Sequence, residues 1–490
     1  MAIDPKLPIP VYFQLKTLLL EEILEGRYGP DGRLPTEHQL CEWHGISRTP
    51  VTRALSELAS EGVVIRHRRR GTFVNPHWLH GHRGGPELRV IVPEGPWEGL
   101  IRRAAPADTR FSVATVELHE LHQALTHAVA EGLGPDLAVL DSVWVPEFTA
   151  SGFLAPLEEL DQGWVTGEYQ DDFLTPLLLT GQSQGRTFAV HSEADVAGMW
   201  YRRAALEALG LGPPATWAEL RAVGLALAGT GGPDGHHPVV LPGGSKAGEA
   251  ATYVLLALLA SNGAAVLEDD LVTLDGPASI EALQLLRELV VDGVVPVEAV
   301  AFEWDRPIRL LAHGSAAICF GGSYEGPRLA KAAGLPLSEL WDHFGFAPIP
   351  AGPRGAPATL AGGMVYGIFR QATHPKLAMR LLEAVTSAEA LARMSRATGQ
   401  IPPRRSAVAQ VAGDSPLLAS TAELLQHAAV RPATPAYARV SVQLQAMLEA
   451  VLTGRLEPPA AVARAAELVG AVTGLPLRGL GPLQGFVTGQ

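Results

Sequence analysis

Hydrophobic residues near the start of the chain recur at helical spacing. In IPVYFQLKTLLLEEILEG (9–26) an inward-facing stripe returns every three or four residues, as in an amphipathic helix: Tyr12, Leu15, Leu18 or Leu19, and Ile23. A second, shorter helix is predicted in TEHQLCEWHG (36–45), which Thr36 caps and Gly45 ends. The pattern therefore predicts two helices joined by the turn DGRLP.

A third helix and a β-hairpin follow directly. Ser47 is placed to cap the helix in SRTPVTRALSELASEG (47–62), whose inward stripe is Val51, Leu55 and Leu58. The next stretch, VVIRHRRRGTFV (63–74), alternates like two strands joined by a basic turn at 68–71. Three helices and a two-stranded ribbon predict a winged helix-turn-helix, an α+β fold that binds DNA.

Strands and helices alternate through the rest of the chain. LRVIVP (88–93), DLAVLDSVW (136–144) and SAAICFGGSYE (315–325) have the apolar runs of buried strands, and PATWAELRAVGLALA (214–228) and ASIEALQLLRELVVDG (278–293) have helical periodicity. This alternation predicts an α/β architecture with parallel strands. Ligands of such folds bind at the carboxyl ends of strands, which here are LDSVW and GGSYE.

Charge is distributed unevenly along the chain. The 490 residues carry a formal net charge of −13. Residues 1–75 hold ten Lys and Arg against nine Asp and Glu, or +1, and residues 47–74 hold six Arg against two Glu, or +4. A small basic region on an acidic chain suits local contact with phosphates.

The cellular compartment of the protein is indicated by its cysteine content and by the sequence of its N-terminal residues. The only two cysteines, Cys41 and Cys319, are far apart in sequence, which argues against a disulfide framework and fits a reducing compartment. The N-terminal residues lack a signal-peptide pattern, and apolar runs such as YVLLALLA are too short to cross a bilayer. We therefore expect a cytoplasmic protein.

The order IPVYFQL, LPTEHQL, GISRTPVTRAL and EGVV followed by RRGTFV resembles the DNA-binding domain of GntR-type bacterial repressors over residues 8–75. The resemblance implies that Arg48, Thr49 and Gly71 contact DNA, and that the protein binds a near-palindromic operator as a homodimer. Three positions depart from the common pattern: His38 replaces an arginine, Thr52 replaces a second helix arginine, and Arg69 replaces a wing-tip glycine. The departures put the operator sequence in doubt, but not the domain.

DNA contacts are expected from the start of the third helix and from the wing. A helix N-terminus offers free N–H groups and a positive dipole end to a phosphate, Arg48 reaches either a phosphate or a guanine edge, and the hairpin arginines follow the backbone or the minor groove. The complete set of expected DNA-contacting residues is Arg33, Thr36, His38, Ser47, Arg48, Thr49, Thr52, Arg53, Arg69, Arg70 and Gly71.

Residues 76–87 form a predicted linker, rich in Gly, Pro and His, between a DNA-binding domain at 1–75 and a sensor domain at 88–490. His77, His80 and His82 are candidate metal ligands. The stretch offers no Cys, and no carboxylate before Glu87, so a solvated hinge is favoured and no metal is expected.

The larger part resembles, over residues 88–470, the extracellular solute-binding proteins of sugar ABC importers, the maltose-binding-like group. The resemblance rests on several segments in the same order, among them GLGPDLAVLDSVWVPEFTASGFLAPLEEL, GRTFAVHSEADVAGMWYRRAALEALGL, HGSAAICFGGSY, FGFAPIPAG and LAGGMVYGI. It implies a two-lobed, type II periplasmic-binding-protein-like fold. Lobe 1 would comprise about 88–195 and 350–400, and lobe 2 about 196–349 and 401–480.

Sugar sites combine aromatic faces with carboxylates that accept from hydroxyls. The resemblance implies that Asp195 bonds sugar hydroxyls, that Tyr324 stacks on a ring, and that Gly362 and Gly363 turn at the cleft, although Met364 replaces the usual Trp after them. The further candidates lie at a strand end or in an expected cleft loop: Asp141 and Trp144, and Glu303 and Trp304. A Trp is more often a core residue than a ligand contact, so packing stays open as the role of both tryptophans.

Together the two parts predict a ligand-responsive transcriptional regulator, not an enzyme, that senses a sugar or oligosaccharide and needs no cofactor. One alternative is a non-sugar effector, such as an amino acid, a polyamine or an organic acid that Arg309 or Arg328 would bind. Another is the aminotransferase-like domain of some GntR-type regulators, but Lys246, Lys331 and Lys376 lack a surrounding pyridoxal phosphate motif. DNA binding without any effector is a further alternative.

Overall fold

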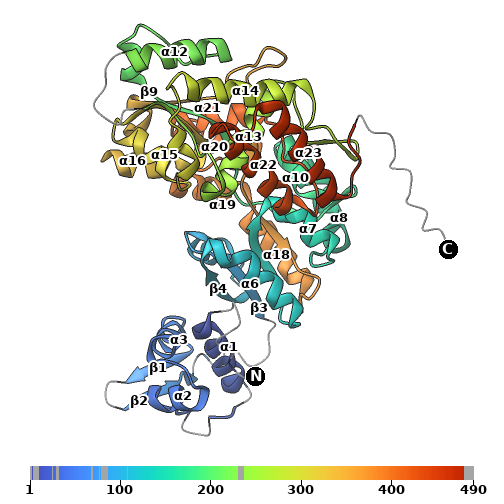
Figure 1. Ribbon diagram of the computed structural model, residues 1–490. Coiled ribbons are helices and arrows are strands. Elements are labelled where there is room, and N and C mark those ends of the chain that lie inside the picture. Colours follow the sequence, from blue (N-terminus) through green and yellow to red (C-terminus); the bar gives the residue numbers. More distant parts are fainter. Residues whose placement is uncertain are drawn as a thin grey trace, which may run out of the picture. The chain divides into compact units, whose positions relative to one another are not determined.

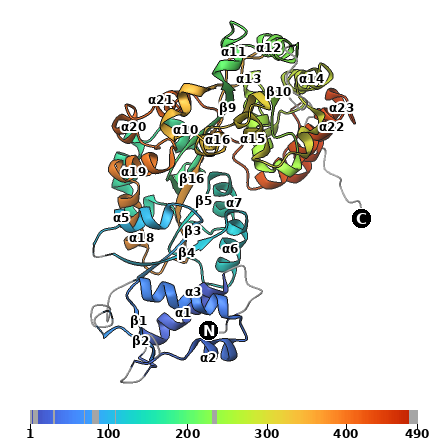
Figure 2. The same cartoon turned by 90° about the vertical axis from the view of Figure 1, so that its left-hand side faces the viewer.

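The computed structural model divides the chain into two compact units (Figures 1 and 2). The first comprises Met1–Leu140, Phe153–Ala155 and Gly367–Ala384, and the second comprises Asp141–Gly152, Pro156–Tyr366 and Val385–Gln490. The structure describes residues 3, 10–24, 26–28, 32–67, 70–76, 78, 87–107, 109–229 and 237–478. Within these ranges no helix is both long enough and apolar enough to cross a membrane.

The first unit begins with the expected three helices and ribbon. They are α1 (Val11–Leu24), α2 (Glu37–His44), α3 (Arg48–Ser60), β1 (Val64–His67) and β2 (Gly71–Val74). The strands pair antiparallel from Val64 opposite Val74 to His67 opposite Gly71. The predicted stripes of α1 and α3 are buried in one core, to which Leu19 rather than Leu18 belongs: Tyr12, Leu15, Leu19, Ile23, Val51, Leu55 and Leu58. The winged helix-turn-helix predicted from hydrophobic periodicity is therefore confirmed.

The helix caps differ in one respect from expectation. Thr36 forms a capping box with Gln39, and Gly45 adopts the left-handed conformation, with φ of 65°, that ends α2. Ser47 occupies the N-cap of α3 but makes no side-chain capping hydrogen bond. A capping hydroxyl accepts from the second or third helical N–H, and Pro50 at the third position has none. The prediction that the Ser47 side chain caps α3 is wrong.

The remainder of the first unit contains a parallel sheet with helices between its strands. Its strands are β3 (Glu87–Pro93), β4 (Arg110–Val116) and β5 (Leu137–Asp141). They lie side by side in the order β4-β3-β5, and both pairs are parallel. The helices between successive strands are α5 (Trp97–Ala104) and α6 (Leu118–Ala130). This part matches the predicted parallel α/β pattern.

The second unit contains a sheet in the order β10-β13-β9-β14, with β15 pairing with β9. The bounds are β9 (Asp195–Arg202), β10 (His237–Val240), β13 (Ala316–Gly322), β14 (Phe344–Ala347) and β15 (Ala361–Gly362). Only β10 and β13 are parallel, and β9 is antiparallel to β13, β14 and β15. The prediction of parallel strands is wrong for β9. No helix crossover leads into β9, which follows β8 (Ala189–His191) after three residues, so the rule for βαβ units does not govern its direction.

Helices surround this sheet and supply much of its core. The longest are α12 (Trp217–Gly229), α13 (Glu249–Ser261), α14 (Pro277–Val291), α22 (Tyr437–Leu452) and α23 (Pro458–Thr473). In both views α22 and α23 lie side by side (Figures 1 and 2). Ten residues of α13 are buried, so this helix has core contacts on nearly every side.

Shorter elements complete the fold. The helices are α7 (Val145–Ala150), α8 (Glu158–Trp164), α9 (Gln170–Asp172), α10 (Thr175–Thr180), α11 (Arg203–Glu207), α15 (Arg306–Ala312), α16 (Gly326–Ala333), α17 (Leu340–His343), α18 (Pro375–Val385), α19 (Ala388–Thr398), α20 (Arg405–Val411) and α21 (Pro416–Leu425). The strands are β6 (Gln182–Ser183), β7 (Arg186–Thr187), β11 (Leu267–Glu268), β12 (Leu271–Val272) and β16 (Met364–Ile368).

Candidate functional sites

The start of α3 presents an exposed polar surface. Ser47, Arg48 and Thr49 are all exposed there. The Arg48 guanidinium does not extend freely, because its Nε donates to Glu37 Oε2 at 3.1 Å. Thr52 Oγ1 lies 3.4 Å from the same carboxylate oxygen. Four of the side chains expected at DNA thus lie together at the start of α3, and Glu37 orients two of them, Arg48 and Thr52.

Glu37 is a residue that sequence reasoning did not single out. Its Oε1 also accepts from Nη2 of Arg66, on β1, at 2.5 Å. Burial acts to raise the pKa of Glu37, but hydrogen bonds from Arg48 and Arg66 hold it below its usual value. The carboxylate therefore stays ionised and fixes two arginines beside the helix start. From the pattern LPTEHQL, Glu37 was expected only as a residue of a capped helix, and no role beside the DNA-contacting arginines was predicted for it.

The wing brings Arg33 and Gly71 together. Arg33 forms a β-bridge with Phe73, and a Cβ at Gly71 would lie 3.4 Å from Arg33 Nε. Gly71 has φ of 116°, a conformation that suits glycine. Arg70 is exposed in the hairpin turn, and Arg69 lies outside the described residues.

Other side chains expected to contact DNA have partners within the winged-helix domain itself. The Arg53 guanidinium stacks 3.8 Å from the Tyr12 ring centroid and donates to Glu57 at 3.3 Å. His38 lies 3.3 Å from Glu42 on an exposed face of α2, and the Thr36 hydroxyl caps that helix. These contacts favour structural roles for Arg53 and Thr36 beside any contact with DNA.

In the second unit Asp195 begins β9 and is held by a buried tyrosine. The Tyr253 hydroxyl lies 2.6 Å from Asp195 Oδ1 and 2.8 Å from the Leu360 carbonyl oxygen. A phenol has one proton, so it donates to only one of these acceptors at a time. A protonated Asp195 satisfies both bonds, because it donates to the phenol oxygen while the phenol donates to Leu360.

Arg431 lies beside this pair. Its Nε donates to Glu249 Oε1 at 3.1 Å, its Nη1 donates to the Ala361 carbonyl oxygen at 3.3 Å, and its guanidinium lies 4.3 Å from the Tyr253 ring centroid. Glu249 also accepts from the Tyr437 hydroxyl at 2.5 Å. We call the set Asp195, Tyr253, Glu249, Arg431 and Tyr437 the polar cluster.

Burial controls the protonation of the carboxyls in and beside the polar cluster. Burial raises the pKa of Asp195 to about 6, and the charge of Asp141 adds to this, whereas Tyr253 and Arg431 oppose it. Burial and the charge of Asp195 raise the pKa of Glu193 to about 8. At pH 7 Glu193 therefore keeps its proton and can donate a hydrogen bond, whereas Asp195 is mostly ionised and accepts.

Tyr324 lies two residues beyond β13, at the strand end predicted to face a ligand. It is half-buried, and burial together with the charges of Glu325 and Asp195 raises its pKa well above the usual value. Glu325, also beyond β13, is 3% exposed, accepts from the Gly322 N–H at 3.0 Å, and has a pKa raised by burial to about 8. The charge of Asp195 contributes to this shift too, so Asp195 and the β13 end belong to one electrostatic neighbourhood.

The two glycines at the end of β15 are required by close packing. Gly362 pairs with Asp195, and a Cβ there would lie 2.6 Å from Asp195 Oδ1. Gly363 has φ of 132°, and a Cβ there would meet the Glu193 carbonyl oxygen at 2.3 Å. These two glycines position the carboxylates rather than offering side chains to a ligand.

The remaining candidates are less closely associated with the polar cluster. Asp141 caps the turn after β5 by accepting from the Val143 N–H at 3.1 Å. Trp144 is half-buried and stacks with Phe148 at 6.3 Å between ring centroids. Packing therefore accounts for one face of Trp144.

Trp304 is 43% exposed, and the Arg328 guanidinium lies 3.9 Å from its ring centroid. One face of this ring is therefore covered by a cation. Glu303 beside it is exposed. Among the described residues, no group of three or more His, Cys, Asp or Glu side chains is arranged to hold a metal ion, and His77, His80 and His82 lie outside them.

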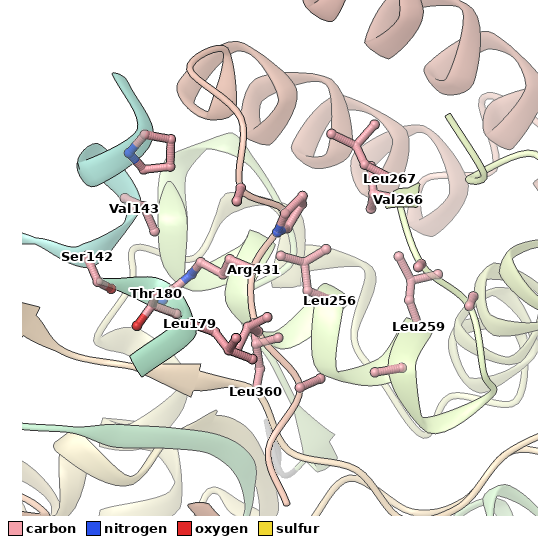
Figure 3. A pocket seen from close by; sticks show the side chains of 18 of the residues that line it. Ser142, Val143, Leu179, Thr180, Leu256, Leu259, Val266, Leu267, Leu360 and Arg431 are labelled. Carbon is pink, nitrogen blue, oxygen red and sulfur yellow. The ribbon is translucent and has the colours of Figure 1, made fainter. Parts of the chain in front are cut away.

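A pocket of about 450 Å³ lies next to the polar cluster, with Arg431 and Leu360 in its wall (Figure 3). Fifteen of its nineteen lining residues are aliphatic, and the other four are Ser142, Thr180, Gln182 and Arg431. In Figure 3 Ser142 and Thr180 lie at the same end as Arg431, whereas Leu259, Val266 and Leu267 lie at the other end. The candidate ligand site thus combines a charged part and an aliphatic part.

Family models match both parts of the chain. Residues 112–392 match the bacterial extracellular solute-binding proteins, and residues 11–74 match the gntR family of bacterial regulatory proteins. The chain belongs to the bacterial extracellular solute-binding protein family and carries a gntR-family DNA-binding domain at its N-terminus. This solute-binding family member is therefore a transcriptional regulator of the gntR type, a combination that implies two partners, DNA and a small molecule.

Individual relatives match one part each. A putative binding protein of Brucella abortus is 23% identical over 397 residues, 79% of this chain and 93% of the relative. The transcriptional repressor NagR of Bacillus subtilis is 44% identical over 75 residues, 15% of this chain and 31% of the repressor. The second match covers the DNA-binding domain alone.

Solved structures of solute-binding proteins have the same fold. An ABC transporter solute-binding protein from Thermotoga lettingae, bound with α-D-tagatose, aligns with TM-score 0.69 and 25% identity over 79% of this chain and all of its own. Maltose-bound MalE3 of T. maritima aligns with TM-score 0.67 and 24% identity, over 79% of this chain and 99% of its own. The expected winged helix followed by a two-lobed solute-binding fold is confirmed.

Proposed function

We propose that the protein is a ligand-responsive transcriptional regulator whose solute-binding part senses a sugar or a related polyol. The observation that carries the proposal is that one chain joins a gntR-family DNA-binding domain to a solute-binding fold containing the polar cluster. The regulator would work in the cytoplasm, where operator DNA is found, and as a homodimer on a near-palindromic site.

Support for a carbohydrate comes from the chemistry around Asp195. Sugar hydroxyls both donate and accept, and a carboxyl with a pKa of about 6 is mostly ionised at pH 7, where it accepts from such hydroxyls. Tyr324 lies in the same electrostatic neighbourhood and offers an aromatic face for a pyranose. The tagatose ligand of the Thermotoga lettingae protein, at 25% identity, belongs to the same chemical class.

On the DNA side, α3 would enter the major groove with Arg48, Thr49 and Thr52 at its leading end, and the wing would follow the backbone with Arg33 and Arg70. Effector and DNA are coupled when the effector binds one conformation of the solute-binding fold better than another and so shifts its population. The shift then changes the affinity of the winged helices for the operator.

The test is a thermal-shift screen of monosaccharides, disaccharides, polyols and other small polar metabolites on the full chain. A bound effector raises the melting temperature, because it stabilises only the folded state. We expect a carbohydrate to do so, and Asp195→Ala and Tyr324→Ala to abolish the shift. Glu298→Ala, an exposed carboxylate on the same unit, serves as the control and should keep it. A carbohydrate shift that survives both site substitutions would refute the assignment of the site.

One observation favours a second candidate, an effector bearing a carboxylate. Arg328 Nη1 is buried, and no hydrogen-bond partner for it occurs among the described residues. A carboxylate would satisfy this donor in a charge-assisted bond. The same screen separates the candidates: a response to gluconate or glucuronate that glucose does not give, and that Arg328→Gln removes, would favour the acidic effector.

A further inference from the structure

The pocket in Figure 3 has a composition that a sugar ring alone does not explain. None of its nineteen lining residues is aromatic, although aromatic faces are what covers the C–H faces of a pyranose. The end away from Ser142 and Thr180 is formed by the side chains of Leu259, Val266 and Leu267. A polar ligand placed against these side chains would lose its hydration without gaining hydrogen bonds.

The volume and position of the pocket also indicate a ligand. A volume of about 450 Å³ lies within the range of about 300–1,000 Å³ typical of small-molecule sites. Arg431 belongs both to the pocket wall and to the polar cluster, where Glu249, Ala361 and the Tyr253 ring hold its guanidinium in place. A ligand with a polar group at Arg431 would therefore extend its other end among the leucines.

We propose that the effector is amphiphilic, a glycoside whose sugar binds at the polar cluster and whose aliphatic substituent fills the pocket of Figure 3. This inference rests on the proposed sensing of carbohydrate and goes beyond it by assigning the substituent. Burying aliphatic carbon against aliphatic walls supplies binding free energy that a bare sugar cannot obtain from this pocket. The aliphatic part therefore distinguishes the effector from ordinary mono- and disaccharides.

The experiment is calorimetric titration of the full chain with methyl, butyl, hexyl and octyl glycosides of glucose, galactose and maltose, below their micelle concentrations. For the sugar that binds, the dissociation constant should fall about fourfold for each added methylene, the factor that corresponds to about 0.8 kcal/mol, until the pocket is full. Longer substituents should also give a more negative heat capacity of binding, the mark of apolar burial.

Ala265→Trp places an indole at the half-buried wall of the pocket. This variant should bind the methyl glycoside within about twofold of the native protein and show no gain with chain length. Ala226→Trp, on the exposed face of α12, is the matched control and should behave like the native protein. Circular dichroism of both variants establishes that they are folded.

The outcomes separate this inference from the proposed function. Binding of methyl and octyl glycosides with equal affinity would overturn the inference and leave carbohydrate sensing intact. Equal binding of octyl glycosides by the native protein and Ala265→Trp would also overturn it, since the substituent would then lie elsewhere. Absence of binding by every glycoside would overturn carbohydrate sensing and the inference together.

Discussion

Tyr253→Phe tests the geometry around Asp195 with the loss of one oxygen atom. The substitution removes the hydroxyl that lies 2.6 Å from Asp195 Oδ1 and 2.8 Å from the Leu360 carbonyl oxygen. It leaves the ring on which the Arg431 guanidinium stacks at 4.3 Å. The packing of this 2% exposed side chain should therefore survive, while Asp195 and the Leu360 carbonyl oxygen lose the hydroxyl that they share.

The expected loss of stability follows from the free-energy cost of leaving buried polar groups without a hydrogen bond. Losing a hydrogen bond to a buried or charged acceptor costs about 1–3 kcal/mol. The Tyr253 hydrogen bond also lowers the pKa of Asp195, so its loss raises that pKa further above about 6. The stability that a carboxyl with a raised folded pKa contributes at low pH is lost as the pH rises to that folded pKa. In the variant this loss should therefore continue to a higher pH than in the native chain.

The assay combines thermal unfolding at pH 5 to 8 with calorimetric titration of the sugar found in the screen. A misplaced Asp195 should weaken sugar binding about tenfold at pH 7, equivalent to about 1.4 kcal/mol. Tyr201→Phe is the control, because Tyr201 is buried but its hydroxyl makes no hydrogen bond to any described residue. If Tyr253→Phe matched both the native protein and this control in affinity and pH profile, the assignment of Asp195 would fail.

Three further predictions concern other side chains. Arg48→Ala should weaken operator binding about 10- to 100-fold in fluorescence anisotropy and, if Arg48 contacts a phosphate, reduce the salt dependence by about one counterion; unchanged affinity would refute its role. The melting temperature of the native protein should fall between about pH 4.5 and 8, because Glu325, with a folded pKa of about 8, keeps its proton there while the unfolded chain loses it. Glu325→Gln should flatten this fall, and an unchanged slope would contradict the raised pKa. Lys16 is 2% exposed, and its Nζ lies 3.1 Å from Glu57 Oε2 and 2.6 Å from Glu61 Oε1. Lys16→Met should therefore destabilise the winged helix by about 1–3 kcal/mol and accelerate hydrogen exchange in α1. Native exchange rates in the variant would refute this.

Sequence patterns predicted the winged helix well because its structure is locally determined. The stripe from Tyr12 to Ile23 and the cap at Thr36 each depend on neighbours within a few residues. The Ser47 cap was mispredicted because Pro50 removes the N–H that the hydroxyl would bond. Pro50 lies only three positions after Ser47, so the sequence itself carries the signal that this cap is incomplete.

The ligand site was only partly predictable because long-range contacts build it. Asp195 was found as a carboxylate in an apolar stretch and through the family resemblance. Tyr253, Glu249 and Arg431 carry no local signal, since the hydrogen bond to Asp195 spans 58 positions and the ion pair between Arg431 and Glu249 spans 182. The direction of β9 likewise depends on strand pairing across more than a hundred positions, which local alternation does not reveal.

The most direct test of effector-controlled DNA binding is the affinity of the full chain for DNA selected from a random pool, measured by fluorescence anisotropy with and without a saturating amount of the carbohydrate found in the screen. Coupling free energies of about 1–3 kcal/mol are typical of such regulators, so the account predicts that the dissociation constant for DNA changes at least about fivefold, and that Asp195→Ala removes the change. An identical dissociation constant with and without a carbohydrate that demonstrably binds would contradict it.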